Sequence, residues 1–385
     1  MIRILNMSIE GNIAIICITE NGKILAKKIE SLVNNCVVYQ IKNKKATLAI
    51  SQEDSVQIVQ KKLSDFVGEV FSKSEYIVFI MATGIVVRSI APYIRSKFSD
   101  PAILVIDEKG QNVISLLSGH VGGANNLTQY ISSLINANPV ITTATDVNQK
   151  ASLDMIAKNL NAYIANFREN VKEVNSMLVN NKCVGLYVEE GYQVDTRGFK
   201  LIESSKALKD CCLNKDIEKI VIVSNKINFT KNTESLKIDS LEIDNNFKHN
   251  YVKEKIIKVI PKDIVIGIGC RRYTDSKLMF NSLLEFFEKQ NIDIKAVKTI
   301  GSIELKKDEK AIIDLAEKLK VPFETFSIDE ISKVDDMFDK SDFVKKNVGV
   351  YSVAEPVAYL LSKGNLIVEK HKYKGITFSV GRIKI

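Results

Sequence analysis

Short apolar runs alternate along the chain with segments whose apolar residues recur at helical spacing. In the first part of the chain, the apolar runs predict strands at 13–19, 76–80, 102–106, 113–117 and 139–141. A turn is expected at 20–22, and the apolar positions between Val56 and Val70 predict a helix over 52–71. Such alternation of strands and helices is typical of α/β domains with largely parallel sheets.

The same alternation continues to the end of the chain and predicts three small α/β units. Further strands are expected at 183–188, 220–224, 264–268, 294–299, 348–352, 366–370 and 375–385. Residues 226–258 are rich in Asn, Lys, Asp and Ser and show weak periodicity, as expected of a connection between domains. The predicted organisation is an N-terminal domain over 1–135, a middle domain over 136–225, a linker region over 226–258 and a C-terminal domain over 259–385.

Length and composition indicate a soluble globular protein. At 385 residues the chain is long enough for two or three domains, and its 45% hydrophobic content supports packed cores. No apolar run approaches the roughly 20 residues that span a bilayer, and charged residues interrupt the N-terminus where a signal peptide would be apolar. We therefore expect a cytoplasmic protein that does not associate with a membrane.

The cysteines and histidines show no metal-binding motif. The six cysteines lack a Cys-x-x-Cys pair, which predicts reduced thiols rather than a disulfide framework or a zinc site. The three histidines, His120, His249 and His371, are too far apart in sequence to form a local metal motif. We therefore predict no metal held by the protein, and we expect His249 and His371 to be surface residues.

The formal net charge of +8 could indicate an anionic partner, but the lysines are dispersed and no basic stripe with stacking aromatic residues stands out. Nucleic-acid binding is therefore disfavoured. Arginine is scarce, and Arg88, Arg95, Arg271 and Arg272 lie inside or beside the motifs described below. Because guanidinium groups bind carboxylates through paired hydrogen bonds, these four are candidates for binding a polycarboxylate ligand, with salt bridges to nearby acidic residues as the alternative.

The segment Ser118-Gly-His-Val-Gly-Gly-Ala-Asn125 places a histidine in a glycine-rich turn, between a predicted strand and a predicted helix that runs to about residue 135. Glycines allow backbone amides to approach a ligand closely, and a helix N-terminus favours an anion. A second turn, from Thr142 to Asp146, follows the next predicted strand, so the two turns are expected to face one cleft at the strand ends. No phosphate-binding loop or serine-hydrolase elbow is present in the sequence.

Several further motifs, taken together with that segment and in this order, resemble one protein family. They are Ala82-Thr-Gly-Ile-Val-Val-Arg88, Ala91-Pro92, Asp100-Pro101, Gly267-Ile-Gly-Cys-Arg-Arg272 and Val353-Ala-Glu-Pro356. The chain thus resembles the CbiG family, the cobalt-precorrin-5A hydrolases of anaerobic cobalamin biosynthesis, and its last unit resembles CobE. The resemblance implies hydrolytic opening of a δ-lactone on a cobalt-containing tetrapyrrole, with cobalt-precorrin-5B and acetaldehyde as products. It implies no cofactor held by the protein, because the substrate carries the cobalt.

The resemblance also suggests roles for the glycine-rich segment. His120 is the predicted general base or proton shuttle, since an imidazole cycles near neutral pH. Asn125 and the backbone amides of Gly122 and Gly123 are the predicted oxyanion donors. The residues predicted to position water or orient the imidazole are Thr143, Thr145 and Asp146. Two alternatives remain for His120, namely helix capping and axial contact with the cobalt of the substrate.

The acidic side chains of the implied substrate motivate a predicted carboxylate clamp. It consists of Arg88, Arg95, Lys97, Arg271 and Arg272, and the predicted substrate-binding set also includes Gly84, Gly269 and Glu355. The alternative to an enzyme is a corrinoid-binding protein that hands on an unstable intermediate, and release of acetaldehyde would discriminate between the two. A homodimer and contacts with neighbouring corrin-pathway enzymes are further possibilities.

Overall fold

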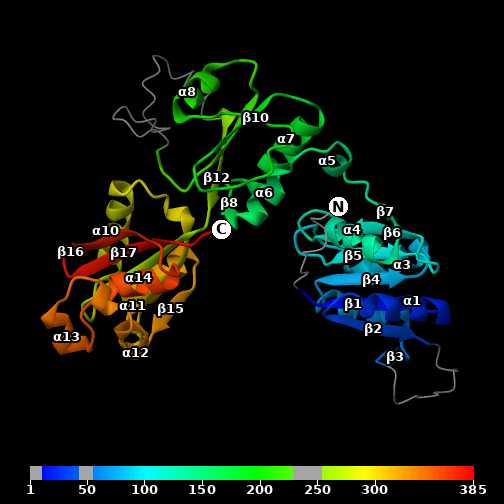
Figure 1. The fold of residues 1–385 in the computed structure, drawn as a ribbon, viewed down its shortest axis with the longest axis horizontal. Helices are drawn as coiled ribbons and strands as arrows, with labels where there is room; N and C mark the ends of the chain where they lie inside the picture. Colours follow the sequence, from blue (N-terminus) through cyan, green and yellow to red (C-terminus); the bar gives the residue numbers. More distant parts are fainter. Residues whose placement is uncertain (1–10, 43–54, 229–253) are drawn as a thin grey trace. The chain divides into compact units, whose positions relative to one another are not determined.

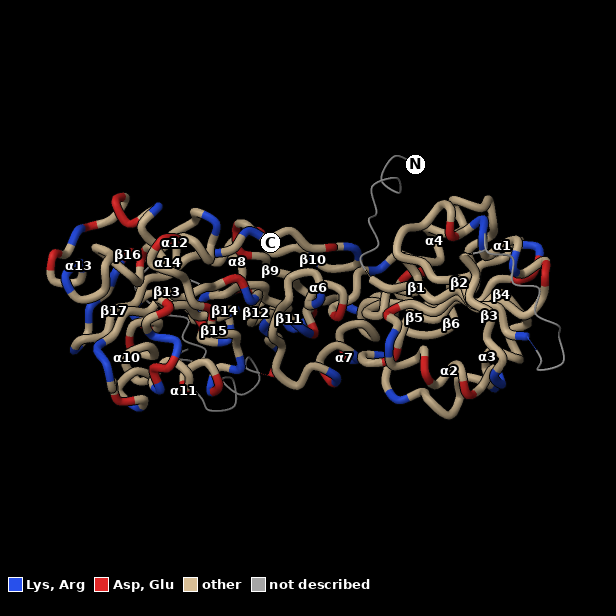
Figure 2. The backbone as a smooth tube through the Cα atoms, turned by 90° about the horizontal axis from the view of Figure 1, so that it is seen from below, with Lys and Arg blue, Asp and Glu red and all other residues tan. Residues whose placement is uncertain are grey.

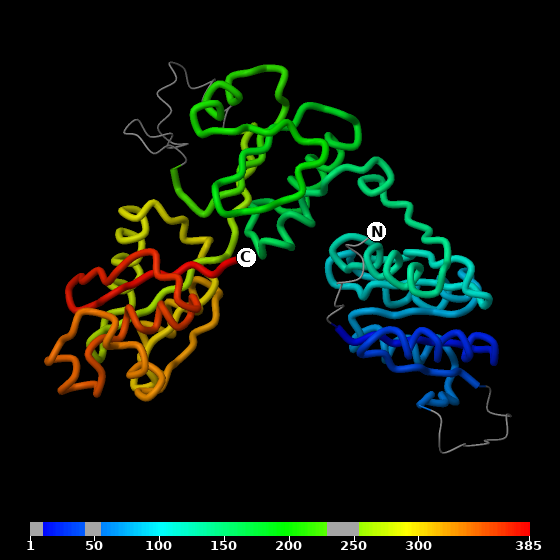
Figure 3. The backbone as a smooth tube through the Cα atoms, in the orientation of Figure 1, coloured from blue at the N-terminus to red at the C-terminus, as the bar shows by residue number. Residues whose placement is uncertain are grey.

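The computed structural model describes residues 11–42, 55–228 and 254–385. The chain forms two compact units, Met1–Lys150 and Ala151–Ile385. Within the described residues, the strands form three sheets that helices cover, which confirms the predicted α/β class with largely parallel strands (Figure 1). The first unit contains one of these sheets. The second contains two, one from the green middle segment and one from the yellow-to-red last segment (Figure 3).

The first unit is built on a seven-stranded sheet in the order β3-β2-β1-β4-β5-β6-β7. Its strands are β1 (Ile13–Cys17), β2 (Cys36–Ile41), β3 (Gln57–Val59), β4 (Tyr76–Ile80), β5 (Ala102–Ile106), β6 (Asn112–Leu117) and β7 (Asn138–Val140). Strands β1 to β5 are parallel, β6 runs antiparallel to β5, and β7 runs parallel to β6. The carboxyl ends of β6 and β7 therefore lie at the end of the sheet where the strands β4 and β5 begin. Strand β7 extends this sheet past residue 135, the predicted end of the N-terminal domain.

Helices cover both faces of the first sheet, with α1 and α4 on one side and α2 and α3 on the other (Figure 2). The helices of this unit are α1 (Glu20–Glu30), α2 (Leu63–Phe71), α3 (Thr83–Ile90), η1 (Ala91–Tyr93), α4 (Ala124–Ile135) and α5 (Ala144–Val147). Ile15 and Val78 belong to the core under α1 and α4, whereas Ile77 and Phe79 belong to the core under α2 and α3. Because successive side chains of a strand point to opposite faces and both faces are buried here, β4 is apolar throughout.

Two sequence predictions in this unit are wrong. Residues 20–22 form the first turn of α1 instead of an isolated turn, because the Thr19 side chain accepts a hydrogen bond from the Gly22 N–H and caps the helix. The predicted helix over 52–71 divides into β3 and α2, and its residues 52–54 lie outside the described residues. Strand β3 pairs with β2 at the edge of the sheet, so strand pairing overrides the helical spacing there.

The middle sheet, in the second unit, has the order β10-β9-β11-β12-β8. Its elements are β8 (Ala162–Tyr163), β9 (Val184–Val188), β10 (Lys200–Leu201), β11 (Lys219–Val223), β12 (Ile256–Pro261), α6 (Leu153–Asn159), α7 (Phe167–Val179) and α8 (Ser205–Leu213). Only β8 is antiparallel among the described strands of this sheet. Val171 and Val174 of α7 pack on one face, and Leu208 of α8 packs on the other.

The last sheet has the order β15-β14-β13-β17-β16. Its elements are β13 (Ile264–Cys270), α10 (Ser276–Lys289), η3 (Ile294–Ala296), β14 (Val297–Ile303), η4 (Glu304–Lys306), α11 (Lys310–Leu319), β15 (Phe323–Phe326), α12 (Ile328–Ser332), η5 (Asp335–Met337), α13 (Asp342–Val348), α14 (Ala354–Leu361), β16 (Leu366–Tyr373) and β17 (Ile376–Arg382). The predicted strand at 348–352 is wrong, because α13 ends at Val348 and irregular chain follows. Val350 in that segment is fully buried, so its apolar character reflects packing of a loop.

The two sheets of the second unit join directly. Only Lys262 and Asp263 separate the end of β12 from the start of β13. Asp263 is fully buried and accepts hydrogen bonds from the Tyr192 hydroxyl at 2.8 Å and from Arg382 Nε at 2.7 Å. The predicted linker region 226–258, of which 229–253 lie outside the described residues together with His249, connects β11 to β12 within the middle sheet. It therefore does not separate the middle sheet from the last one.

Gly267 lets α14 pack directly on β13. A Cβ atom at Gly267 would lie 1.9 Å from the Ala354 carbonyl oxygen and 2.7 Å from the Ala358 nitrogen. We expect Gly267→Ala to lower the free energy of unfolding by about 3 kcal/mol, because the strand or the helix backbone must move. Gly269→Ala is the matched control, since its Cβ would meet nothing closer than 3.8 Å. Urea denaturation followed by circular dichroism measures both variants, and equal midpoints would contradict the close packing at Gly267.

All six cysteines are free, and at least two of them are buried. Burial raises the pKa of the Cys17 thiol and of the Cys212 thiol to about 11. At pH 8 their thiolate fraction is roughly a hundredfold below that of an exposed cysteine, and it recovers only as the pH rises toward the thiol pKa. We therefore expect both thiols to react with a disulfide reagent roughly a hundredfold more slowly in the native protein than in the unfolded chain. Peptide mass mapping after timed reactions measures the two rates, and similar values would refute this expectation.

Candidate active site

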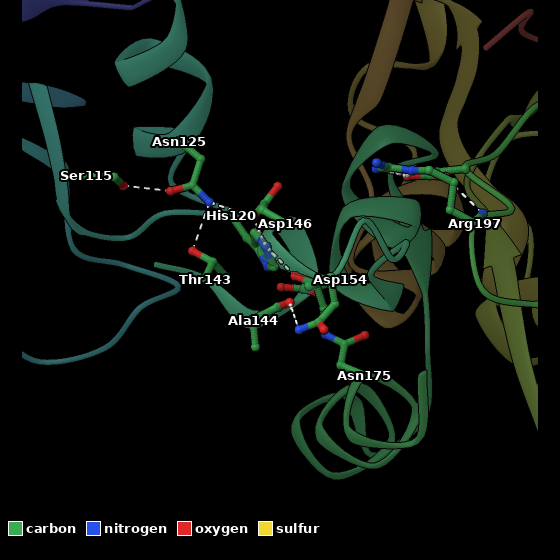
Figure 4. A network of polar contacts seen from close by, with 12 residues as sticks. Ser115, His120, Asn125, Thr143, Ala144, Asp146, Asp154, Asn175 and Arg197 are labelled. Atoms are coloured by element: carbon green, nitrogen blue, oxygen red, sulfur yellow. Dashed lines mark hydrogen bonds and ion pairs between the residues drawn. The ribbon is translucent and has the colours of Figure 1, made fainter. Parts of the chain in front are cut away.

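The two turns that follow β6 and β7 lie together at one end of the strands of the first sheet. The parallel pairing of these neighbouring strands brings residues 118–123 beside residues 141–143, and each turn leads into a helix, α4 or α5. Figure 4 shows side chains from the two turns pointing toward one another. The structure thus brings together the two turns that the sequence predicted to share a site at the strand ends.

Close packing within the first turn requires glycine at two positions. A Cβ atom at Gly122 would lie 2.4 Å from the Ser118 Cβ, and one at Gly119 would lie 2.7 Å from the Asn125 Oδ1 atom. Ser118 adopts the left-handed conformation at φ 57°, and its hydroxyl donates to the Asp100 carbonyl oxygen at 3.0 Å. These contacts hold the histidine-bearing turn in one conformation.

His120 and Asp146 form the centre of the site. The His120 Nε2 atom lies 2.8 Å from Asp146 Oδ2 and 2.7 Å from Thr145 Oγ1. The side chains of His120 and Asp146 are 17% and 36% exposed, so both remain accessible from solvent. A carboxylate at Nε2 favours the tautomer that carries its proton there and has its basic lone pair on Nδ1. The same carboxylate stabilises the imidazolium that forms when the ring accepts a proton.

The buried side chain of Asn125 connects the two turns. Its Nδ2 group donates to Thr143 Oγ1 at 2.9 Å and to Asp146 Oδ2 at 2.8 Å, while its Oδ1 atom accepts from Ser115 Oγ at 2.6 Å. Figure 4 shows this chain of contacts from Ser115 through Asn125 to Thr143. Both amide hydrogens are therefore used within the protein. The sequence prediction made Asn125 an oxyanion donor, whereas this geometry makes it a residue that positions Asp146.

The backbone amides of the glycine turn differ in what they bind. The Gly123 N–H donates to the His120 carbonyl oxygen at 3.0 Å and closes the turn. The Gly122 N–H donates to no group in the part of the chain that the structure describes. Of the two glycine amides predicted as oxyanion donors, the Gly122 amide is thus the one that remains open to a substrate oxygen.

Arg95 and Lys97 lie on the loop that leads into β5, at the same end of the sheet. The Asp100 carboxylate accepts hydrogen bonds from the backbone N–H groups of Arg95 and the following residue at 2.8 and 2.9 Å. The Asp100 carbonyl oxygen binds Ser118, so this residue couples the loop to the glycine turn. The side chains of Arg95 and Lys97 are exposed, as contact with substrate carboxylates would require. Their place in the carboxylate clamp stays a prediction.

Gly84 and Arg88 lie at the opposite end of the strands of the first sheet. They belong to α3, which follows the carboxyl end of β4, whereas the His120 turn follows the carboxyl end of β6. Because β6 runs opposite to β4, the carboxyl ends of these two strands lie at opposite ends of the sheet along the strand direction. The exposed Arg88 guanidinium lies beside Gly84. The structure therefore separates these two predicted substrate-binding residues from the cluster around His120.

The remaining predicted arginines lie in the second unit, on the turn after β13. Arg272 donates to Asp308 Oδ1 and to the Leu305 carbonyl oxygen, both at 2.6 Å, which agrees with the salt-bridge alternative. Arg271 is exposed and has no ion pair within the described residues. Gly269 precedes this turn, and the space around it would admit a side chain. Arg271 is thus the residue of this group whose charge remains available to a ligand.

Two other expectations in the second unit need correction. Glu355, predicted to bind substrate, is buried and accepts a hydrogen bond from the Lys370 N–H at 3.2 Å while pairing with its Nζ at 3.4 Å. Its carboxylate therefore holds α14 against β16. His371, expected at the surface, is half-buried and stacks on the Phe286 ring with centroids 5.2 Å apart. Neither position could be placed without knowing which elements pack together.

Sequence reasoning missed Ser115 and gave no role to Asp100, the two residues that support the site from within the sheet and the neighbouring loop. Ser115 is a polar residue inside an apolar strand, and this interruption was the available signal. Asp100 belongs to an Asp-Pro motif, but its function appears only when the loop and the glycine turn are seen to share its carboxylate and carbonyl groups.

Within the described residues, no three His, Cys, Asp or Glu side chains gather in a way that could hold a metal ion. Nor does any helix there have the length and apolar character needed to cross a membrane. A carboxylate and a hydroxyl contact His120 Nε2, and this combination supports proton transfer.

Comparison with known proteins matches three parts of the chain to one family. Residues 65–146 match Cobalamin synthesis G N-terminal, residues 151–237 match Cobalamin biosynthesis central region, and residues 264–381 match Cobalamin synthesis G C-terminus. The cobalt-precorrin-5A hydrolase of Salmonella typhimurium is 38% identical over 376 residues, which cover 96% of this chain and 97% of that protein.

Two solved structures are also similar to parts or most of the chain. A cobalamin biosynthesis protein G homolog from Sulfolobus solfataricus is 22% identical, covers 96% of this chain and 97% of that chain, and has a TM-score of 0.37. CobE, a protein from the cobalamin (vitamin B12) biosynthetic pathway, is 23% identical, covers 32% of this chain and 92% of that chain, and has a TM-score of 0.30. The likeness to the Salmonella protein spans nearly the whole chain at 38% identity, and this chain therefore belongs to the CbiG family of cobalt-precorrin-5A hydrolases.

Proposed function

We propose that the site around His120 catalyses the hydrolysis of cobalt-precorrin-5A, the reaction for which the family's curated members are named. The observation that carries the proposal is the His120–Asp146 pair, held at 2.8 Å where two turns meet at the strand ends. A histidine can act as a general base, and a carboxylate bound to one ring nitrogen fixes the orientation in which the other nitrogen accepts a proton. Asn125 supplies the further support, because it donates to the same Asp146 oxygen that contacts His120.

The proposed reaction consumes water and converts cobalt-precorrin-5A into cobalt-precorrin-5B and acetaldehyde. Water adds to the δ-lactone carbonyl while His120 takes its proton, and the ring C–O bond then breaks to leave a carboxylic acid and an alcohol. Loss of the alcohol proton lets the adjacent carbon–carbon bond break to form the aldehyde, and the carbon left on the macrocycle takes up a proton. We assign the Gly122 N–H to the carbonyl oxygen as it becomes negative.

The substrate itself brings the cobalt, so the proposed reaction needs no cofactor from the protein. Arg95 and Lys97, exposed on the loop beside the glycine turn, offer charges for the carboxylates of the macrocycle. Six free thiols also fit a reducing compartment, and we place the enzyme in the cytoplasm on that ground. Cell fractionation with an antibody to the chain tests this location.

Acetaldehyde release by the purified chain, supplied with cobalt-precorrin-5A generated in situ, tests the proposed function. We expect acetaldehyde, measured by its enzymatic reduction with NADH, to appear in step with the loss of substrate absorbance. Heat-denatured protein is the control for spontaneous breakdown of the substrate. If the chain binds the corrinoid unchanged and releases no acetaldehyde, the corrinoid-binding alternative is correct and the hydrolase proposal is not.

A further inference from the structure

The turn after β13 displays a tyrosine to solvent in a strained conformation. Tyr273 is 96% exposed, and its backbone lies in the left-handed region at φ 59°. Bulky residues rarely adopt this conformation because the side chain crowds the backbone. Since the ring is also outside any core, neither packing nor backbone preference explains a tyrosine at this position.

Hydrogen bonds hold this turn in place. The buried Glu309 carboxylate accepts from the Tyr273 N–H at 3.3 Å and from the Thr274 N–H at 3.1 Å. The Thr274 hydroxyl donates to the Arg271 carbonyl oxygen at 2.8 Å, and Arg272 ties the turn to the segment after β14. The chain thus fixes a turn whose exposed ring makes no contribution to its own core.

The turn of Tyr273 and the two turns beside it carry exposed cations. Arg271, Lys307 and Lys374 are exposed, and none of the three has an ion pair within the described residues. The Arg271 side chain lies against Gly375 in the turn between β16 and β17. The turns after β13, after β14 and between β16 and β17 therefore meet at the carboxyl end of β13, the kind of position where α/β sheets bind ligands.

We infer that this Tyr273 platform, formed by Arg271, Tyr273, Lys307 and Lys374, binds the tetrapyrrole substrate. The Tyr273 ring stacks on the conjugated macrocycle, and Arg271 binds one of its peripheral carboxylates. An exposed aromatic ring, on a turn where cations outside any ion pair also lie, suits a conjugated ring system edged with acetate and propionate groups. The inference rests on the proposed function and extends substrate binding to a residue that no sequence motif indicated.

Titration of the full chain with uroporphyrin, a stable fluorescent tetrapyrrole edged with acetate and propionate groups, tests the platform. We expect Tyr273→Ala to raise the Kd by about tenfold and Tyr273→Phe to keep it within about twofold, because the ring makes the contact. Arg271→Gln should raise the Kd by about threefold and weaken its salt dependence. Phe343→Ala is the matched control, since it removes another ring of the same unit that is 77% exposed, and it should bind as the wild type does.

Thermal stability separates a binding role from a structural one. Tyr273→Gly relieves the left-handed strain, so its melting temperature should rise by about 2 °C while uroporphyrin binding falls as in Tyr273→Ala. Failure of the wild type to bind uroporphyrin, or unchanged affinity in Tyr273→Ala, would overturn the inference. The proposed reaction is judged separately, because His120→Asn should retain uroporphyrin binding while losing acetaldehyde release. Absence of acetaldehyde with the wild type would overturn the proposed function and leave the uroporphyrin result standing.

Discussion

Replacing His120 with asparagine is expected to lower kcat for acetaldehyde release by about 10²- to 10⁴-fold, because the reaction loses its proton acceptor. An asparagine can still form hydrogen bonds near Asp146 and Thr145, which contact His120 in the wild type, but it cannot accept a proton near neutral pH. The substrate-binding groups remain, so KM should change much less than kcat.

Steady-state assays of acetaldehyde release measure this effect, with Asn126→Ala as the matched control. Asn126 is exposed and follows Asn125 on α4, so its removal should leave kcat unchanged. Wild-type turnover in His120→Asn would exclude His120 from the mechanism. The absorption spectrum of the bound substrate tests the axial-ligand alternative, because a cobalt–imidazole contact would change the spectrum in the wild type and not in the variant.

Asp146→Asn is expected to lower kcat by about 10²- to 10⁴-fold although this residue acts through His120. The new amide would place either a neutral oxygen or an N–H group where the carboxylate now faces both His120 Nε2 and the Asn125 Nδ2 group. The imidazole would lose its orientation and the charge that stabilises its protonated form. Asp107→Asn is the control, since it removes a carboxylate that accepts hydrogen bonds within the turn at the opposite end of the sheet.

A double variant shows whether the two residues act as one unit. If Asp146 works by positioning His120, the variant His120→Asn/Asp146→Asn should be no slower than His120→Asn alone, within about threefold. Independent roles would instead multiply the two losses. Kinetics of the four proteins therefore decide between a coupled pair and two separate contributions, and a multiplied loss would refute the positioning role of Asp146.

Most strands were predictable because the sheets are buried on both faces. Continuous apolar runs such as the one in β4 or β5 mark a strand that packs helices on each side, and they need no knowledge of the rest of the chain. The wrong predictions concern segments whose structure depends on contacts with other parts of the chain. Strand β3 exists because β2 offers an edge for pairing, and the apolar residues after α13 pack as a loop around Val350.

The candidate site divides in a similar way. The glycine-rich turn, with His120 and Asn125, was predictable because a cluster of glycines indicates a tight turn. The structure agrees, since Gly119 and Gly122 have no room for a side chain. The meeting of that turn with Thr145 and Asp146 was predicted because each turn follows a predicted strand, and the parallel pairing of β6 with β7 is the contact that brings the two turns together. The positioning role of Asn125 required its three hydrogen-bond partners, which come from β6 and from the second turn.

Local residue patterns were sufficient for the α/β class, for most strands and for the turn that carries His120, because periodicity and glycine content act over a few neighbouring residues. Tertiary packing alone decided which of the predicted ligand residues could meet. The reversal of β6 relative to β5 places Gly84 and Arg88 at the end of the sheet opposite His120. The approach of three turns distant in sequence brings exposed cations to the neighbourhood of Tyr273. Strand direction and the meeting of distant turns depend on contacts between segments far apart in the chain, and such contacts leave no periodic trace in the sequence.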